Sequence, residues 1–176
     1  MAEIGGEPDR PKPRLSGPVP LTGDHDVSEF DCGEPALDDW LRHRALKNES
    51  RFSRTYVVCD GNRVVAYFCI AAGAVERGAA PGKVRRNAPD TIPVSVIGRL
   101  AVCRDHAGKG LGADILSDAL RRIALASQSI GIGAVLVQAK DDAAKRFYLK
   151  CAEFVEYPAD SRTLFLPIET VVAAFS

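Results

Sequence analysis

The sequence is short of the features that place a protein in a membrane or outside the cell. No apolar run is long enough to span a bilayer, and no N-terminal apolar stretch resembles a signal peptide. The five cysteines are odd in number and scattered, without a Cys-x-x-Cys pair, and the three histidines show no metal-ligand spacing. We therefore expect a cytoplasmic protein with reduced thiols, no membrane contact and no bound metal.

The chain also has no net charge, since 23 basic side chains balance 23 acidic ones. This balance hides two basic clusters. Residues 42–54 carry five bases and one acid, and residues 83–109 carry six bases and two acids. Clusters of this kind allow a neutral protein to hold a polyanion on one face, although each is also consistent with an ordinary solvated surface.

The length of 176 residues suits one domain with a substantial core. Residues 1–14 contain three prolines and two glycines and are predicted to form a flexible tail. Residues 15–176 are expected to form the domain.

Apolar patterning within the domain predicts an α/β fold with a mixed sheet. The predicted strands are 55–59, 64–75, 94–102, 133–139, 154–157 and 163–166. The predicted helices are 34–48, 113–126, 142–148 and a short one from residue 168. Residues 76–93 are expected to form a long loop, and Asp141 is expected to cap the helix that follows it.

The most informative segment is the glycine-rich turn between the strand ending at Val102 and the helix that follows. Backbone N–H groups at the start of a helix, with no side chains in the way, form an anion site. A Walker loop would need Ser or Thr after Lys109, where this chain has Gly110. A dinucleotide fingerprint needs Gly-x-Gly-x-x-Gly, whereas the spacing here is Gly-x-Gly-x-Gly. The interpretation that remains is the pyrophosphate of coenzyme A.

This turn, with residues 99–102 before it and residues 144–148 after it, resembles the acyl-CoA-binding core of the GNAT N-acetyltransferases. The GNAT motif has Gln or Arg where this chain has Ala107, so one side chain is lost while the backbone cradle remains. The resemblance implies the GNAT acyltransferase fold and acetyl-CoA as co-substrate. The residues that it implies for acetyl-CoA binding are Leu100, Ala101, Val102, Ala107, Gly108, Lys109, Gly110, Leu111, Gly112 and Ala113.

Tyr148 matches the GNAT tyrosine that donates a proton to the departing CoA sulfur, and we expect it to be catalytic. The backbone near residues 100–102 could offer an N–H to the thioester oxygen. No strong base is required, because an α-amine has a pKa of about 7.7–8.0 and a neighbouring ester lowers it further.

The similarity extends to the TacT-like toxins, which are GNAT enzymes of bacterial toxin–antitoxin operons. It is carried by residues 30–33, 37–41, 53–58, 84–89 and 97–102. It implies acetylation of the α-amine of aminoacyl-tRNA, which blocks translation, together with a homodimer and a neutralising ribbon-helix-helix antitoxin. The basic residues expected to contact tRNA are Arg42, Lys47, Arg51, Arg85, Arg86 and Arg99.

Two alternative functions stay open at this point. The protein could be a GNAT enzyme that acetylates a small amine or a protein N-terminus, with incidental basic clusters. It could also bind acyl-CoA without catalysis, an interpretation supported only by Ala107.

Overall fold

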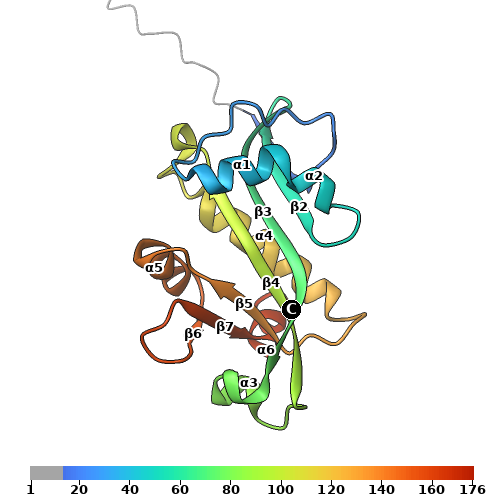
Figure 1. The fold of residues 1–176 in the computed structure, drawn as a ribbon, viewed down its shortest axis with the longest axis vertical. Coiled ribbons are helices and arrows are strands. Elements are labelled where there is room, and N and C mark those ends of the chain that lie inside the picture. Colours follow the sequence, from blue (N-terminus) through green and yellow to red (C-terminus); the bar gives the residue numbers. More distant parts are fainter. Residues whose placement is uncertain (1–13) are drawn as a thin grey trace, which may run out of the picture.

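The computed structural model describes residues 14–176, so all but the last residue of the predicted tail lies outside the described part. Seven strands form one sheet in the order β1-β2-β3-β4-β5-β7-β6 (Figure 1). Their bounds are β1 Leu15–Pro20, β2 Arg54–Asp60, β3 Arg63–Glu76, β4 Thr91–Val102, β5 Ala134–Gln138, β6 Val155–Glu156 and β7 Thr163–Pro167. Neighbouring strands are antiparallel except β4 and β5, which are parallel. The predicted mixed sheet is confirmed.

Helices cover both faces of this sheet. The helices are α1 Pro35–His43, α2 Ala45–Asn48, α3 Gly82–Arg85, α4 Leu111–Ala126, α5 Asp142–Cys151 and α6 Ile168–Ala174, with short 3-10 turns at Arg77–Ala79 and Arg104–His106. Figure 1 shows α1 and α2 across one face and α4 behind the other. Within residues 14–176, no helix is both long and apolar enough to cross a membrane.

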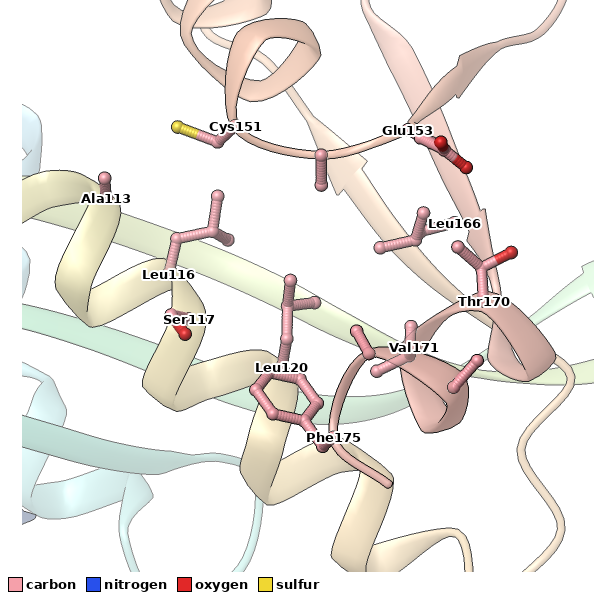
Figure 2. A pocket seen from close by; sticks show the side chains of 13 residues that line it. Ala113, Leu116, Ser117, Leu120, Cys151, Glu153, Leu166, Thr170, Val171 and Phe175 are labelled. Atoms are coloured by element: carbon pink, nitrogen blue, oxygen red, sulfur yellow. The ribbon is translucent and has the colours of Figure 1, made fainter.

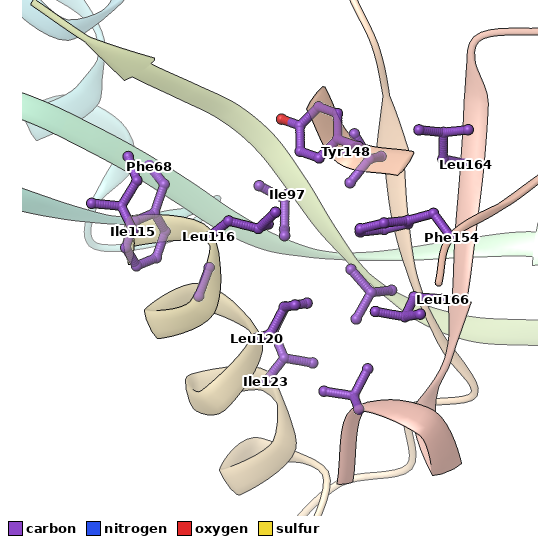
Figure 3. Close-up of a cluster of buried hydrophobic side chains, with 14 of the residues drawn as sticks. Phe68, Ile97, Ile115, Leu116, Leu120, Ile123, Tyr148, Phe154, Leu164 and Leu166 are labelled. Carbon is purple, nitrogen blue, oxygen red and sulfur yellow. The ribbon is translucent and has the colours of Figure 1, made fainter. Parts of the chain in front are cut away.

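The larger core layer lies between α4 and the sheet. The apolar side chains of α4 recur every three or four residues and therefore form one buried stripe. This stripe comprises Ile115, Leu116, Ala119, Leu120, Ile123 and Ala124. It packs against side chains of β3, β4 and β7, as Figure 3 shows for Phe68, Ile97 and Leu166.

The second core layer lies under α1. Trp40 and Leu41 of this helix are buried against the sheet, and the Trp40 ring stacks on Tyr67 with 5.9 Å between ring centres. The Tyr67 hydroxyl donates a hydrogen bond to the Leu37 carbonyl at 2.8 Å. This contact fixes the start of α1 over the middle of the sheet.

Two predicted boundaries were wrong. The helix expected over residues 34–48 is interrupted at Arg44, whose φ of −122° is not helical, so α1 and α2 are separate. The loop expected over residues 76–93 is shorter, because β3 runs to Glu76 and β4 begins at Thr91. Proline has no backbone N–H to donate to a neighbouring strand. Pro93 is tolerated within β4 because the pairing of β4 with β5 starts one residue later, at Val94.

Strand β1 was not predicted. Its sequence contains two prolines, and it forms the outer edge of the sheet against β2. A missing backbone N–H is tolerated at an edge strand, where one side of the backbone has no neighbour.

Candidate acetyl-CoA and acceptor site

The site begins where β4 separates from β5. The pairing of these parallel strands ends at Ile97 and Val137, although β4 continues to Val102. The register with β3 shifts at the same level, which makes Gly98 the extra residue of a β-bulge. Alternate N–H groups of residues 98–102 therefore face a gap instead of a neighbouring strand of the described chain. They are placed to donate to a carbonyl oxygen that enters this gap.

A cavity of about 240 Å³ lies at this gap. Its lining residues are Cys32, Leu37, Leu100, Ala101, Val102, Gly112, Lys140 and Phe147. The structure thus brings together four of the residues expected from sequence, three from β4 and one from α4. The other four, Cys32, Leu37, Lys140 and Phe147, were not predicted to line the site, although three of them lie in the segments that carry the resemblance. Lys140 had a positional signal, because it follows β5 and the carboxyl ends of neighbouring parallel strands share one edge.

The Cys32 thiol in this cavity is not poised to act as a nucleophile. Burial, with the nearby Asp38 carboxylate, raises the pKa of Cys32 to about 11. Asp38 is itself buried and accepts a hydrogen bond from the Cys32 backbone N–H at 3.0 Å. Cys32 therefore stays a neutral thiol at neutral pH, which favours direct transfer between two bound substrates over an acetyl-cysteine intermediate.

The glycine turn adopts the geometry of an anion cradle. Gly108 and Gly110 have φ values of +75° and +82°, a conformation that glycine adopts without strain. Gly110 is the N-cap of α4 and offers no side chain, so the first N–H groups of this long helix have no side-chain cap. Lys109 is exposed beside them and adds positive charge. Helix α4 begins at Leu111, two residues earlier than predicted, so Leu111 and Ala113 both belong to its first turn.

The segment before the turn is braced by ionic contacts. The ring of buried His106 hydrogen-bonds Asp105 at 3.0 Å, and Asp105 accepts from the Arg63 guanidinium at 2.7 Å. These two partners hold the pKa of the Asp105 carboxyl below its usual value, so it remains ionised. His106 therefore has a structural role: it holds the 3-10 turn at Arg104–His106, which leads through Ala107 into the glycine turn.

Tyr148 is placed by the cap of its helix. The Asp141 carboxylate accepts the Ala144 N–H at 2.7 Å, which confirms the predicted cap and starts α5. Tyr148 is 7% exposed, and its ring meets those of Phe147 and Phe154 edge to face at 5.3 and 5.8 Å. Figure 3 shows its hydroxyl pointing away from Phe154.

Burial raises the pKa of the Tyr148 phenol well above its ordinary value. The hydroxyl therefore keeps its proton at neutral pH. A neutral hydroxyl is the form that can donate a proton to a leaving group.

The six basic residues expected to contact tRNA occupy two regions. Arg85 and Arg86 lie in and directly after α3, at the far end of the β3–β4 hairpin. With a rise of about 3.3 Å per residue along β4, the seven residues from Thr91 to Gly98 separate this end from the gap by about 23 Å. Both arginines are exposed, but they are not part of the gap.

The other four lie on the α1 side of the sheet. The Arg99 guanidinium lies 4.2 Å from the centre of the Trp40 ring, beside the bulge. Arg42 is engaged within the protein, since its guanidinium donates to the Phe30 carbonyl. Lys47 and Arg51 are exposed.

A larger cavity of about 640 Å³ runs along α4 towards α6 (Figure 2). It touches the predicted site only through Ala113. Within the described chain its lining is mainly apolar and includes no basic side chain. It is therefore poorly suited to hold a phosphate.

Comparisons with known proteins agree with this geometry. Residues 21–154 match the model of the acetyltransferase (GNAT) family. The chain is 45% identical to the tRNA-acetylating toxin of Mycobacterium tuberculosis, over 86% of this chain and 91% of that protein.

Two solved structures have similar folds. AtaT complexed with acetyl-methionyl-tRNAfMet matches with a TM-score of 0.81 at 28% identity, over 92% of this chain and 98% of that one. A mutant AtaT toxin bound to the C-terminus of the antitoxin AtaR and to acetyl-CoA matches with a TM-score of 0.76 at 27% identity, over 92% and 96%.

Proposed function

The chain belongs to the acetyltransferase (GNAT) family, and on that premise we propose that it is a toxin that uses acetyl-CoA to acetylate the α-amine of aminoacyl-tRNA. Acetylation of this amine blocks translation. The observation that carries the chemistry is the gap between β4 and β5, whose cavity is lined by Phe147, the residue that precedes the buried, protonated Tyr148 in α5. The acceptor is inferred from the 45% identity to a tRNA-acetylating toxin.

The residues present fit acetyl-CoA. Left-handed Gly108 and Gly110 leave open space above the first N–H groups of α4, where a pyrophosphate can be held. Residues 99–102 pair with β3 on one side only, and their other side, which has no strand neighbour in the described chain, can take the extended pantetheine arm. Acetyl-CoA supplies an acetyl group activated as a thioester.

The protein contributes hydrogen bonds and one proton to the transfer. A backbone N–H among residues 100–102 stabilises the carbonyl oxygen as it gains negative charge. Tyr148 donates its hydroxyl proton to the sulfur as the bond from carbon to sulfur breaks. The attacking amine needs no strong base, because a good fraction of an aminoacyl-ester amine is already neutral at cell pH.

The proposal includes the partners of the toxin. A ribbon-helix-helix antitoxin neutralises it in the cytoplasm, and the toxin forms a homodimer. Support for an antitoxin comes from the AtaT structure that contains the C-terminus of AtaR.

The direct test is mass spectrometry of charged tRNA after incubation with the purified protein and labelled acetyl-CoA. We expect an added acetyl group on the α-amine, and loss of the product with Tyr148→Phe. Unmodified tRNA together with acetylation of a polyamine would overturn the proposal and favour a small-amine acetyltransferase. The same experiment identifies the preferred amino acid.

A further inference from the structure

An exposed aromatic ring stands among basic side chains at the corner formed by residues 44–54, which we call the α2–β2 corner. Phe52 is 65% exposed, an unusual position for a large apolar side chain. The guanidinium carbon of Arg51 lies 5.0 Å from the centre of its ring. Arg51 therefore covers one face of the ring, and the other face is open to a planar partner.

The corner carries a positive charge around this ring. It has four bases against one acid, and Arg44, Lys47, Arg51 and Arg54 are all exposed. The one acid, Glu49, is turned inward and accepts the Thr55 N–H at 2.8 Å. The outward charge of the corner is consequently that of the bases, which suits a polyanion.

The register of the sheet places this corner level with the gap. Arg54, at the end of the corner, pairs with Ile70 of β3, and Ile70 pairs with Ile97 of β4. Ile97 is also the last residue of β4 that pairs with β5. With strands about 4.8 Å apart, the two steps from β2 to β4 put Arg54, the last residue of the corner, about 10 Å across the sheet from β4, whose far side borders the gap.

An aromatic ring with basic neighbours is the arrangement that binds unpaired nucleotides. Bases in a duplex are already stacked on each other, whereas an unpaired base can stack on a protein ring while lysines and arginines contact its phosphates. The acceptor end of aminoacyl-tRNA is single-stranded and carries the reactive amine. Its terminal nucleotides must therefore lie close to the gap during the reaction.

We propose that the ring of Phe52 stacks on an unpaired base near the 3′ end of the tRNA. The base lies between this ring and the rest of the RNA strand, and Lys47 and Arg51 contact the phosphates of that strand. This inference rests on the proposed function and adds a substrate contact to it. The acidic and apolar surface of a protein partner is the competing occupant, and the experiments below distinguish the two.

The first test is steady-state kinetics with aminoacyl-tRNA. Phe52→Ala is expected to raise KM for the tRNA about 5- to 150-fold, the range given by loss of one base–aromatic stack. Phe52→Trp should keep KM close to the original value, because tryptophan also offers a planar ring. Phe52→Leu should resemble the alanine variant, and a leucine variant with normal KM would overturn the proposal.

Leu46→Ala provides the matched control. Leu46 is 51% exposed on the same corner but has no aromatic face, so its removal should leave KM unchanged. Folding of every variant is checked by circular dichroism and by the dissociation constant for acetyl-CoA. Both are expected to be normal, since these side chains are mainly in solvent.

The second test measures coupling between the ring and the base. Aminoacylated RNAs are prepared with an abasic nucleotide at one of the unpaired positions next to the 3′-terminal nucleotide. At the stacked position, Phe52→Ala should cause no further loss beyond that of the abasic RNA. Fully multiplicative losses at every position would overturn the proposal.

The two levels of inference fail in different ways. If the unaltered protein leaves charged tRNA unmodified, the proposed function itself is wrong. If it acetylates charged tRNA but Phe52→Ala leaves KM normal, only the stacking proposal is wrong. Weaker self-association or weaker antitoxin binding by that variant would then assign Phe52 to a protein interface.

Discussion

Arg99 and Trp40 form a cation–π pair at the point where the sheet opens, with 4.2 Å between the guanidinium carbon and the ring centre. Trp40 is in turn stacked on Tyr67, so the charge is held against a rigid aromatic surface. The pair joins α1 to the bulge of β4. It gives the α1 side of the gap a positive charge in a defined position.

This pair predicts an effect of Arg99 on the pH dependence of the reaction. A fixed cation lowers the pKa of a nearby α-ammonium group and so favours the neutral amine. Arg99→Ala should therefore move the acidic limb of the kcat profile to higher pH, whereas Arg99→Lys should keep most of the original profile. An Arg99→Ala profile with an unmoved acidic limb would show that the charge does not act on the amine.

Tyr148→Phe should lower kcat about 10²- to 10⁴-fold, the usual contribution of a positioned proton donor. The ring and its contacts with Phe147 and Phe154 remain, so the melting temperature and the acetyl-CoA dissociation constant should not change. Single-turnover kinetics and calorimetry measure these quantities. A variant that also lost acetyl-CoA binding would indicate that the hydroxyl binds the thioester in the ground state and does not act by protonating the leaving sulfur.

The raised pKa of Tyr148 predicts the shape of the alkaline limb. Because burial favours the protonated phenol, deprotonation occurs above the ordinary value of about 10. The kcat of the enzyme should rise as the amine loses its proton and then stay level to about pH 9.5. The profile is measured on short time scales, with a control for hydrolysis of the aminoacyl ester.

The glycines of the turn should differ in their tolerance of alanine. At Gly110 the φ of +82° makes alanine cost about 1–2 kcal/mol, and acetyl-CoA binding should weaken with the distorted cradle. At Gly112 a Cβ would lie 3.5 Å from Phe147, an ordinary contact, so alanine should be accepted. Urea unfolding and acetyl-CoA titration of the two variants provide the comparison, and equal losses would contradict it.

Arg122 should matter for stability alone. Its guanidinium lies 3.9 Å from the centre of the Tyr56 ring, contacts Asp118 at 2.7 Å and donates to the Pro18 carbonyl at 3.0 Å. These contacts fasten β1 to α4. Arg122→Ala should therefore lower the free energy of unfolding by about 2 kcal/mol, while the acetyl-CoA dissociation constant stays the same.

The parts of the site that could be predicted from sequence depend on local patterns. The glycine turn, the apolar strand before it and the Asp141 cap each involve residues close together in the chain. Cys32 and Leu37 escaped prediction because they reach the cavity only through the packing of the α1 region on the sheet, more than 50 residues before β4. No local pattern encodes such a contact.

The basic cluster of residues 42–54 shows a second limit. Arg42 and Arg51 are equivalent in a count of charges, yet Arg42 is bound to the Phe30 carbonyl, whereas Arg51 is exposed with its guanidinium over the Phe52 ring. Phe52 has no feature in the sequence that separates it from a core residue. Its exposure comes with its place in the turn between α2 and β2.

Where β4 separates from β5, the sheet has an opening that can be reached from both of its faces. Cys32 and Leu37 border it from the α1 side, and Gly112 and Phe147 border it from the side of α4 and α5. Donor and acceptor can therefore enter from opposite directions and be present together. Neither has to leave before the other arrives, so the enzyme can dispense with a covalent carrier and release its two products independently.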